Sequence, residues 1–402
     1  MNENKPIIIV GAGIGGLTAG LCLKRAGFEV QIIERFDEVR EVGAGILLQP
    51  NASGVLYNRL GLGDAIDGVS AQMTRTEFKS WTGRALLAQE EVETDALPGP
   101  NRMIHRAALQ QVLYDAMGPD KVLLDSPVEG FETGESGTVS AITAGGERIS
   151  GQALIGADGL HSVIRTQLFG EQATPLRYHG YTCWRGITSA FSHDDFPFGT
   201  LMEIQGRGRR AGLGYLDDER IYWWATVDVA RDQKDCPNSI HDDLLQIYDE
   251  FPEFFRATLK ATPTDQILRN DIYDRAPISR WGTGAVTLLG DAAHPTAPNL
   301  GQGACSAIED ADMLAICLKG SDDLEQGLRD YERLRQPRTA KLQKLSKRFG
   351  DMGQWNNRLM VWLRETSIAL LPESLAEKQE LWIWDYDAQR EYEQAMSPRK
   401  AN

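Results

Sequence analysis

The feature that most constrains the fold is a strand, a glycine-rich turn and a helix near the start of the chain, written "PIIIVGAGIGGLTAGLCLKRAG". A short run of β-branched residues predicts a buried strand, and helical spacing then runs to a glycine stop. Gly11 allows a sharp turn, Gly13 a close approach to a pyrophosphate, and Gly16 close packing of the helix on the strand. A second strand, "FEVQIIE", ends in Glu34, whose carboxylate can bind ribose hydroxyls and disfavours a 2′-phosphate. The pattern predicts a Rossmann-type unit for FAD or NAD rather than NADP, and it leaves the choice between these two open.

Composition excludes several classes of protein. The 402 residues carry a net charge of −15 and have a sequence pI of about 5.0, so we expect no nucleic-acid partner. No apolar run of about 18 residues is present, and glycines break the short apolar run at the start, which predicts neither a transmembrane helix nor a signal peptide. The five cysteines are scattered and no metal-spaced His/Cys cluster occurs. We therefore expect unpaired thiols, no bound metal and a cytoplasmic protein.

In two later segments, a predicted buried strand is again followed by a turn that carries an aspartate. "ALIGADGLHSVIR" places Asp158 after a strand, and "GAVTLLGDAAHPTAPNLGQGACSAIEDA" places Asp291 after another, followed by a helix starting near Gly301. Between them, "YTCWRGITSAF", "TLMEIQGRG" and "RIYWWATVD" alternate like strands and predict an inserted antiparallel sheet. "GRGRRAG" contains a GxGxxA spacing, but no helix follows it, so we interpret it as a hairpin turn. The expected fold class is α/β, with a Rossmann-like dinucleotide-binding lobe over 1–175 and 271–345, an inserted antiparallel-sheet lobe over 176–270, and a helical C-terminus over 346–402.

Taken in order, these motifs resemble those of the group A FAD-dependent monooxygenases, the para-hydroxybenzoate hydroxylase-like aromatic hydroxylases. "GAGIGG" with Glu34 is similar to the family's adenosine-diphosphate site, "ADGLHSVIR" to its DG motif, and "GDAAHPTAPNLGQGACSAIEDA" to its GD motif. The similarity covers roughly residues 5–345. Within the family, the urate hydroxylase and zeaxanthin epoxidase branches look nearest.

The resemblance implies FAD as cofactor and NAD(P)H as co-substrate. It makes the lobe over 1–175 and 271–345 the FAD-binding lobe, and the inserted sheet over 176–270 the substrate lobe. Asp291 would hold ribityl hydroxyls, and the helix start at Gly301 would stabilise negative charge on the reduced flavin. Arg106 would neutralise the pyrophosphate or reach the ribityl chain. Asp158 and Arg165 would lie where FAD and NAD(P)H approach, an internal ion pair being the alternative. The residues implied to contact FAD are Gly11, Gly13, Gly15, Gly16, Glu34, Arg35, Leu47, Arg106, Val128, Asp158, Asp291, Pro298, Gly301, Gln302, Gly303 and Ala304.

The resemblance also implies a chemistry. In the family, reduced flavin adds O2 to give a C4a-hydroperoxide, one oxygen enters the substrate and the other leaves as water. Arg210 and Tyr222 resemble the Arg and Tyr that hold and activate substrate in the urate hydroxylases, which makes them candidate catalytic residues; a structural contact is the alternative. Arg185 in "CWRG" is a further candidate. Strand alternation predicts that Tyr222 and Trp224 share a face opposite Trp223.

Two C-terminal segments remain open. Residues 354–372 are apolar enough for a helix over the substrate mouth, a dimer contact, a membrane-surface helix or plain packing. Residues 381–387, "LWIWDYD", carry a WxW pair but lack the Ile-Pro that follows it in flavin halogenases, so we exclude that activity.

We therefore expect a monooxygenase that hydroxylates an aromatic or N-heterocyclic small molecule. Its partners would be that substrate, O2 and NAD(P)H, with no integral membrane association and a monomeric or homodimeric state. The alternatives are a flavoprotein reductase or dehydrogenase without oxygen insertion, a polyene epoxidase, and a non-catalytic redox sensor.

Overall fold

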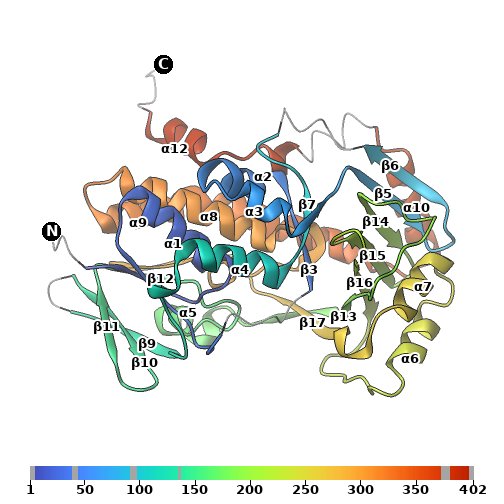
Figure 1. Ribbon diagram of the computed structural model, residues 1–402, viewed down its shortest axis with the longest axis horizontal. Helices are drawn as coiled ribbons and strands as arrows, with labels where there is room; N and C mark the ends of the chain where they lie inside the picture. The colour runs from blue at the N-terminus through green and yellow to red at the C-terminus, as the bar shows by residue number, and fades with distance from the viewer. Residues whose placement is uncertain (1–4, 39–43, 91–96, 135–136, 373–380, 398–402) are drawn as a thin grey trace.

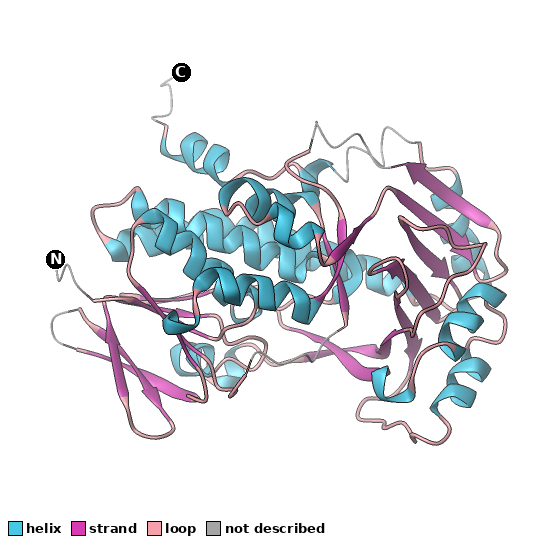
Figure 2. Ribbon diagram, in the orientation of Figure 1, coloured by secondary structure: helices cyan, strands magenta, loops and turns pink. Residues whose placement is uncertain are grey.

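A computed structural model describes residues 5–38, 44–90, 97–134, 137–372 and 381–397. Figure 1 shows an elongated molecule with helices and a parallel sheet at one end and a large, mostly antiparallel sheet at the other. Figure 2 shows that the two ends differ in kind, since long helices dominate the first and strands dominate the second.

A five-stranded parallel sheet forms the centre of the first lobe, in the order β18-β12-β1-β2-β8. Ile7, Ile8 and Ile9 of β1 are fully buried because layers cover both faces of the sheet. The predicted β-branched strand is therefore confirmed. The strands are β1 (Ile7–Val10), β2 (Val30–Ile33), β8 (Val122–Leu123), β12 (Ala153–Gly156) and β18 (Val286–Leu288).

Four helices cover one face of this sheet, with α1 and α8 side by side (Figure 1). Gly15 permits the approach, because a Cβ there would lie 3.0 Å from the Ala307 Cβ and 2.9 Å from a Leu289 methyl. The predicted glycine stop is confirmed, as Gly27 adopts φ 99° at the end of α1. These helices are α1 (Ile14–Ala26), α4 (Arg106–Met117), α8 (Gln302–Lys319) and α9 (Leu324–Gly353).

Smaller elements complete this lobe. One three-stranded sheet, in the order β11-β10-β9, packs against β1 and β12. A second three-stranded sheet, in the order β3-β7-β4, contacts α8 through β3. These elements are β3 (Gly45–Leu48), β4 (Ser70–Gln72), β7 (Arg102–His105), β9 (Val128–Thr133), β10 (Val139–Thr143), β11 (Arg148–Gly151), α2 (Pro50–Gly54), α3 (Gly63–Asp67) and α5 (Val163–Phe169).

The second lobe is built on a seven-stranded sheet in the order β17-β13-β16-β15-β14-β5-β6. The neighbours pair antiparallel except β14 and β5, which run parallel. β5 and β6 come from residues that sequence analysis placed in the first FAD-binding segment, and in the structure they belong to this sheet. Its strands are β5 (Arg75–Ser80), β6 (Ala85–Glu90), β13 (Arg177–Ile187), β14 (Thr200–Gln205), β15 (Arg209–Tyr215), β16 (Ile221–Asp228) and β17 (Leu268–Asp274).

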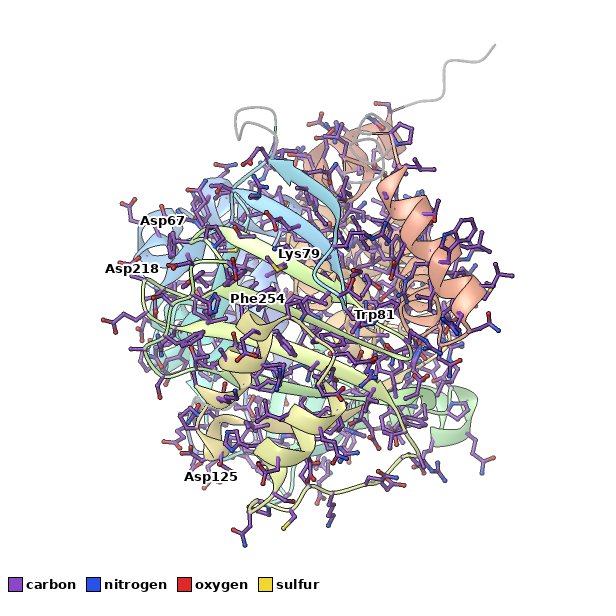
Figure 3. All side chains as sticks on the ribbon, turned by 90° about the vertical axis from the view of Figure 1, so that its right-hand side faces the viewer. Asp67, Lys79, Trp81, Asp125, Asp218 and Phe254 are labelled. Carbon is purple, nitrogen blue, oxygen red and sulfur yellow. The ribbon has the colours of Figure 1, made fainter. Side chains whose placement is uncertain are left out.

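Helices α6 (Ile240–Ile247) and α7 (Glu253–Lys260) cover the outer face of this sheet. Pro252 caps the start of α7 and separates it from α6. Figure 3 views this side, where the Lys79 ammonium lies 5.3 Å from the centroid of the Phe254 ring. The predicted hairpin turn at "GRGRRAG" is confirmed, since it joins β14 to β15.

The C-terminal part is helical where it is described, with α10 (Arg358–Ala369) and α12 (Ala388–Met396). Residues 373–380 and 398–402 of the predicted helical segment lie outside the described residues. Among the described helices, none has both the length and the apolarity needed to cross a membrane.

Candidate active site

The first glycine-rich turn fits the space between β1 and α1. Gly11 adopts φ 107°, and a Cβ there would lie 2.5 Å from the Ala157 carbonyl oxygen. A Cβ on Gly16 would overlap the Gly11 carbonyl, so α1 rests directly on its own loop. A Cβ on Gly13 would meet nothing within 4 Å in the described part of the chain. Gly13 thus presents open backbone at the start of α1, where N–H groups favour an anion.

Glu34 lies next to this turn, at the end of β2. Its carboxylate accepts hydrogen bonds from the Ala12 N–H at 2.6 Å and from the Phe36 N–H at 3.2 Å. Val128 begins β9 just beyond the segment whose Ser126 N–H donates to the Glu34 carbonyl. Arg35 is exposed and lies 4.7 Å from the centroid of the Phe36 ring. The Glu34 carboxylate therefore contacts the glycine-rich turn, and the segment that leads into Val128 pairs with the Glu34 backbone.

Asp291 occupies a short 3-10 turn immediately after β18. The turn requires Gly290 at φ 61°. The Asp291 side chain is exposed, yet partial desolvation by the protein around it raises the pKa of its carboxyl, while the charges of His294 and Arg106 oppose that rise. Arg106 reaches this region from the first turn of α4. The structure thus brings an acid and a cation from two predicted positions together.

The N-terminus of α8 is open in the same way as that of α1. Gly301 adopts φ 66°, and no described side chain caps the helix. A Cβ on Gly303 would meet nothing within 4 Å among the described residues. Pro298 begins the preceding 3-10 turn and is exposed, and Ala304 is half-buried on the first turn of α8. Unpaired N–H groups at this end attract negative charge.

Gln302 lies on the buried side of this helix start. Its amide donates to the Gln49 side chain at 2.6 Å, and the Gln49 amide donates to the Leu300 carbonyl at 2.8 Å. The Cys305 thiol contacts the Leu47 carbonyl at 3.5 Å. Leu47 of β3 and Gln49, which follows that strand, therefore contact the first turn of α8 and Leu300, which precedes that helix.

The DG motif plays a structural part that sequence analysis did not specify. One Asp158 carboxylate oxygen accepts from the Val163 and Ile164 N–H groups at 2.8 and 3.3 Å, which caps α5. Arg165 donates to the Ala292 and Ala293 carbonyls at 2.7 and 2.9 Å. Among the described contacts, Asp158 and Arg165 do not form the ion pair considered as the alternative. Arg165 instead ties the DG motif to the turn that carries Asp291.

Tyr222 and Trp224 share the inner face of the seven-stranded sheet, as predicted, with ring centroids 5.7 Å apart. Trp223 lies on the opposite face, 6.3 Å from the Phe255 ring. Burial raises the pKa of Tyr222 well above its usual value, and the Arg185 charge lies close enough to the Tyr222 hydroxyl to oppose that rise. Small residues make room for the rings: a Cβ on Gly45 would lie 2.5 Å from the Tyr222 ring.

Arg210 shares this face but does not contact Tyr222 in the described contacts. Its guanidinium pairs with the Glu203 carboxylate at 3.1 Å and donates to the Asn299 side chain. The Tyr181 hydroxyl donates to the same Asn299 oxygen at 3.0 Å, and the Asn299 amide donates to the Ser346 carbonyl at 3.0 Å. Arg210 therefore joins the sheet to the loop that precedes α8. The structure brings Arg185, rather than Arg210, to Tyr222.

These positions can accommodate FAD. Open glycine backbone lies at the starts of α1 and α8, and Glu34 and Asp291 stand at the ends of β2 and β18. Gly13 would face the pyrophosphate, Glu34 a ribose, Asp291 and Arg106 the polar chain, and the start of α8 the flavin edge. The donor set matches what a dinucleotide with an anionic reduced ring requires.

Residues 4–346 match the sequence family described as "FAD binding domain". This range covers well over half of the chain. The chain belongs to this family of FAD-dependent monooxygenases.

Curated members of the family are similar over most of this chain. The aurachin C monooxygenase/isomerase of Stigmatella aurantiaca is 36% identical over 92% of this chain and 95% of its own length. The chloroplastic zeaxanthin epoxidase of Prunus armeniaca is 36% identical over 83% of this chain, but this chain spans only 53% of that protein. The solved structure of Klebsiella pneumoniae HpxO complexed with FAD and uric acid has a TM-score of 0.88 at 26% identity, covering 94% of this chain and 96% of that one.

Sequence analysis missed the charged network behind the flavin-side helix of this FAD-dependent monooxygenase. Glu309 and Asp310 of α8 are fully buried, and Arg335 of α9 pairs with them at 2.7 and 2.6 Å. Asp310 also pairs with His294 at 2.5 Å and accepts from the Gly290 N–H at 3.1 Å. His294 and Arg335 lower the pKa of Asp310 to about 2. Two adjacent acids inside an apolar helix were the available signal, because buried charges need partners.

Proposed function

We propose that this monooxygenase hydroxylates an aromatic or N-heteroaromatic small molecule that carries an ionisable hydroxyl or keto group. O2 and NAD(P)H would be its co-substrates. The observation that carries the proposal is the Arg185–Tyr222 pair beside the Trp224 ring, on the sheet face that looks toward the GD motif. This face offers flat apolar surface for a ring together with one donor and one cation for an oxygen atom.

Tyr222 is suited to donating a proton in a hydrogen bond rather than removing one. Its raised pKa keeps the phenol protonated at neutral pH. The Arg185 charge lies near the Tyr222 hydroxyl, and because arginine has no acceptor atom, the Tyr222 proton is left to point toward another acceptor. A deprotonated oxygen on the substrate ring would accept that hydrogen bond, and the positive charge of Arg185 would attract it. Both interactions favour the electron-rich anion that an electrophilic hydroxylation needs.

Apolar residues between the sheet and the GD loop would keep water from the reacting centre. Tyr181, Cys183, Ile272 and Ala297 form a buried cluster there, with Trp224 packed against it. FAD, once reduced by NAD(P)H, supplies the activation of O2. The protein's part is to orient the ring, hold its oxygen and exclude water. Arg210 and Asn299 contribute by fixing the loop before α8 against the sheet.

The similar proteins support a compact heterocyclic substrate. The Klebsiella structure is a complex with FAD and uric acid, an N-heterocycle. The aurachin C relative covers nearly the whole of both chains, and it is a monooxygenase. Polyene epoxidation is supported less, because the zeaxanthin epoxidases match over only about half of their length.

The test is aerobic NAD(P)H consumption by the FAD-loaded protein with a panel of phenols, quinolones, purines, nicotinate-like acids and a polyene. Mass spectrometry of each mixture would identify products. We expect one heteroaromatic or phenolic class to stimulate consumption and gain one oxygen. Tyr222→Phe should lower kcat/KM for that compound by about 10²-fold and divert consumption to hydrogen peroxide.

Tyr215→Phe is the matched control, because Tyr215 is equally buried in the same sheet but stacks on Phe196 on the other face. It should retain near-normal coupling. Oxygenation of the polyene alone, or stimulated consumption without any oxygenated product, would contradict the proposal. Equal losses in the Tyr222 and Tyr215 variants would remove the assigned role of Tyr222.

A further inference from the structure

Helix α10 presents an apolar stripe to solvent. Leu359, Trp362, Leu363 and Leu370 are 62%, 58%, 44% and 75% exposed. Trp362 and Leu363 follow Leu359 by three and four residues, and Leu370, at the C-terminal end of the helix, follows Leu363 by seven, so all four lie on one side. Large apolar side chains gathered in this way on a surface indicate an interaction site. The helix lies at the edge of the seven-stranded sheet, beside β6 (Figure 1).

The opposite side of α10 carries buried charges that fix its rotation. Arg364 is 2% exposed and donates to the Gly353 carbonyl at 2.9 Å and the Gly206 carbonyl at 2.6 Å. Glu365 is 7% exposed and pairs with Arg84 at 2.8 Å. Turning the leucines inward would expose these anchors and break their bonds. The usual helix pattern is therefore inverted, and the outward apolar stripe is built into the fold.

The surroundings of the stripe are cationic in an otherwise acidic chain. Residues 341–358 contain five exposed Lys and Arg against one exposed acid, whereas the whole chain has a net charge of −15. Arg358 starts α10 and is exposed, and the Arg207 guanidinium donates to the Asn356 carbonyl at 3.4 Å just before it. Exposed Arg348 stands near the end of α9, and the acid there, Asp351, is paired with Lys347 at 2.7 Å.

We propose that α10 is a docking helix for the surface of an anionic lipid bilayer. Its apolar stripe would enter the interface while the flanking arginines meet the headgroups. The negative charge of the remaining surface would repel such a bilayer, so this end of the molecule is the one that can approach. A symmetric pair of chains joined through α10 would place the same cations against each other, which disfavours a second copy.

The docking helix is supported by the same backbone that covers the substrate face. Arg364 binds the Gly353 carbonyl, and a Cβ on Gly353 would lie 3.0 Å from the Arg210 side chain. The inference goes beyond the proposed function and does not depend on it, because docking can be measured without any turnover.

Vesicle flotation of the FAD-loaded protein tests the proposal. The probes are vesicles of phosphatidylglycerol mixed with phosphatidylcholine, and vesicles of phosphatidylcholine alone. We expect binding to the anionic vesicles that weakens at about 0.5 M salt and is much weaker on the neutral ones. Arg358→Glu should weaken it at least about fivefold, the effect of one basic residue near a charged bilayer. The double variant Leu359→Glu with Trp362→Glu should abolish it.

Phe198→Glu is the matched control, since Phe198 is 53% exposed on the connection between β13 and β14. It should bind vesicles like the unaltered protein. Brominated lipids should quench part of the tryptophan fluorescence, and Trp362→Phe should remove that part. Failure of the unaltered protein to float with anionic vesicles would overturn the proposal, as would full binding by the double variant. A dimer in sedimentation that only the double variant dissociates, without vesicle binding, would assign the stripe to a second copy instead.

Discussion

At the scale of single residues, the partner of Tyr222 decides what that tyrosine can do. Arg185 lies on β13 and Tyr222 on β16, and the register places Arg185 opposite Trp224, two residues from Tyr222. Arg185 also donates to the Asn270 side chain at 3.2 Å, which fixes its guanidinium. The phenol is thereby held as a donor beside a positive charge.

Replacing Arg185 by Gln should change a pH profile as well as a rate. Without the cation, the ionised substrate loses stabilisation and its pKa in the complex rises. The rise of kcat with pH, which reports the bound substrate, should therefore move to higher pH by about one unit, with a fall of roughly tenfold at neutral pH. Arg177→Gln, which alters an edge pair with Asp274, is the control and should leave the profile in place. An unmoved profile in the Arg185 variant would show that this charge does not act on the substrate.

Asp312 gives a second prediction at this scale, on stability. Burial raises its pKa to about 6, outweighing Arg59 at 3.7 Å. A carboxyl group whose pKa rises on folding favours the folded state below its unfolded pKa, near 4, and this contribution is lost as pH rises to about 6. Asp312→Asn should thus raise the free energy of unfolding by about 2 kcal/mol at pH 7.5 and by little at pH 4. Urea denaturation at the two pH values measures it, and an equal effect at both would refute the assignment.

At the scale of elements, the C-terminal segment reaches back to the start of α8. The Trp384 indole N–H donates to the Gln49 side chain at 2.7 Å, and Gln302 donates to the same oxygen. Trp382 instead stacks on Lys341, whose ammonium lies 3.5 Å from the ring centroid. Residues 381–387 therefore contact the start of α8 through Gln49, and the WxW pattern did not predict this contact.

Trp384→Phe should leave the fold intact, at a cost of about 1 kcal/mol for one hydrogen bond. Because Gln49 fixes the Leu300 carbonyl before Gly301, loosening it should weaken FAD binding several-fold and shift the flavin midpoint potential. Fluorescence titration of FAD and equilibrium reduction with a reference dye measure both quantities. Trp382→Phe serves as the control. If both variants behave alike, Trp384 merely anchors the tail.

At the scale of the whole molecule, local patterns were predictable and long-range partners were not. The strand–turn–helix at Gly11, the hairpin at residues 206–208 and the shared face of Tyr222 and Trp224 follow from neighbours in sequence. The contact of Trp384 with Gln49 joins residues 335 positions apart. Local periodicity likewise does not predict the parallel pairing of β5 with β14, because the pattern within a strand does not identify its partner. The order of the motifs predicted the family. The packing of the sheet determines that Arg185, rather than Arg210, lies near Tyr222.

Insertion of one atom of O2 into the substrate is the reaction that defines this chain as a monooxygenase. The most direct test is turnover under 18O2 with the compound that best stimulates NAD(P)H consumption, repeated under ordinary O2 in 18O-labelled water. The account predicts a product carrying one 18O atom in the first case and none in the second, with one NAD(P)H consumed per product. Label entering from water, or complete conversion of O2 to hydrogen peroxide with unaltered substrate, would contradict it.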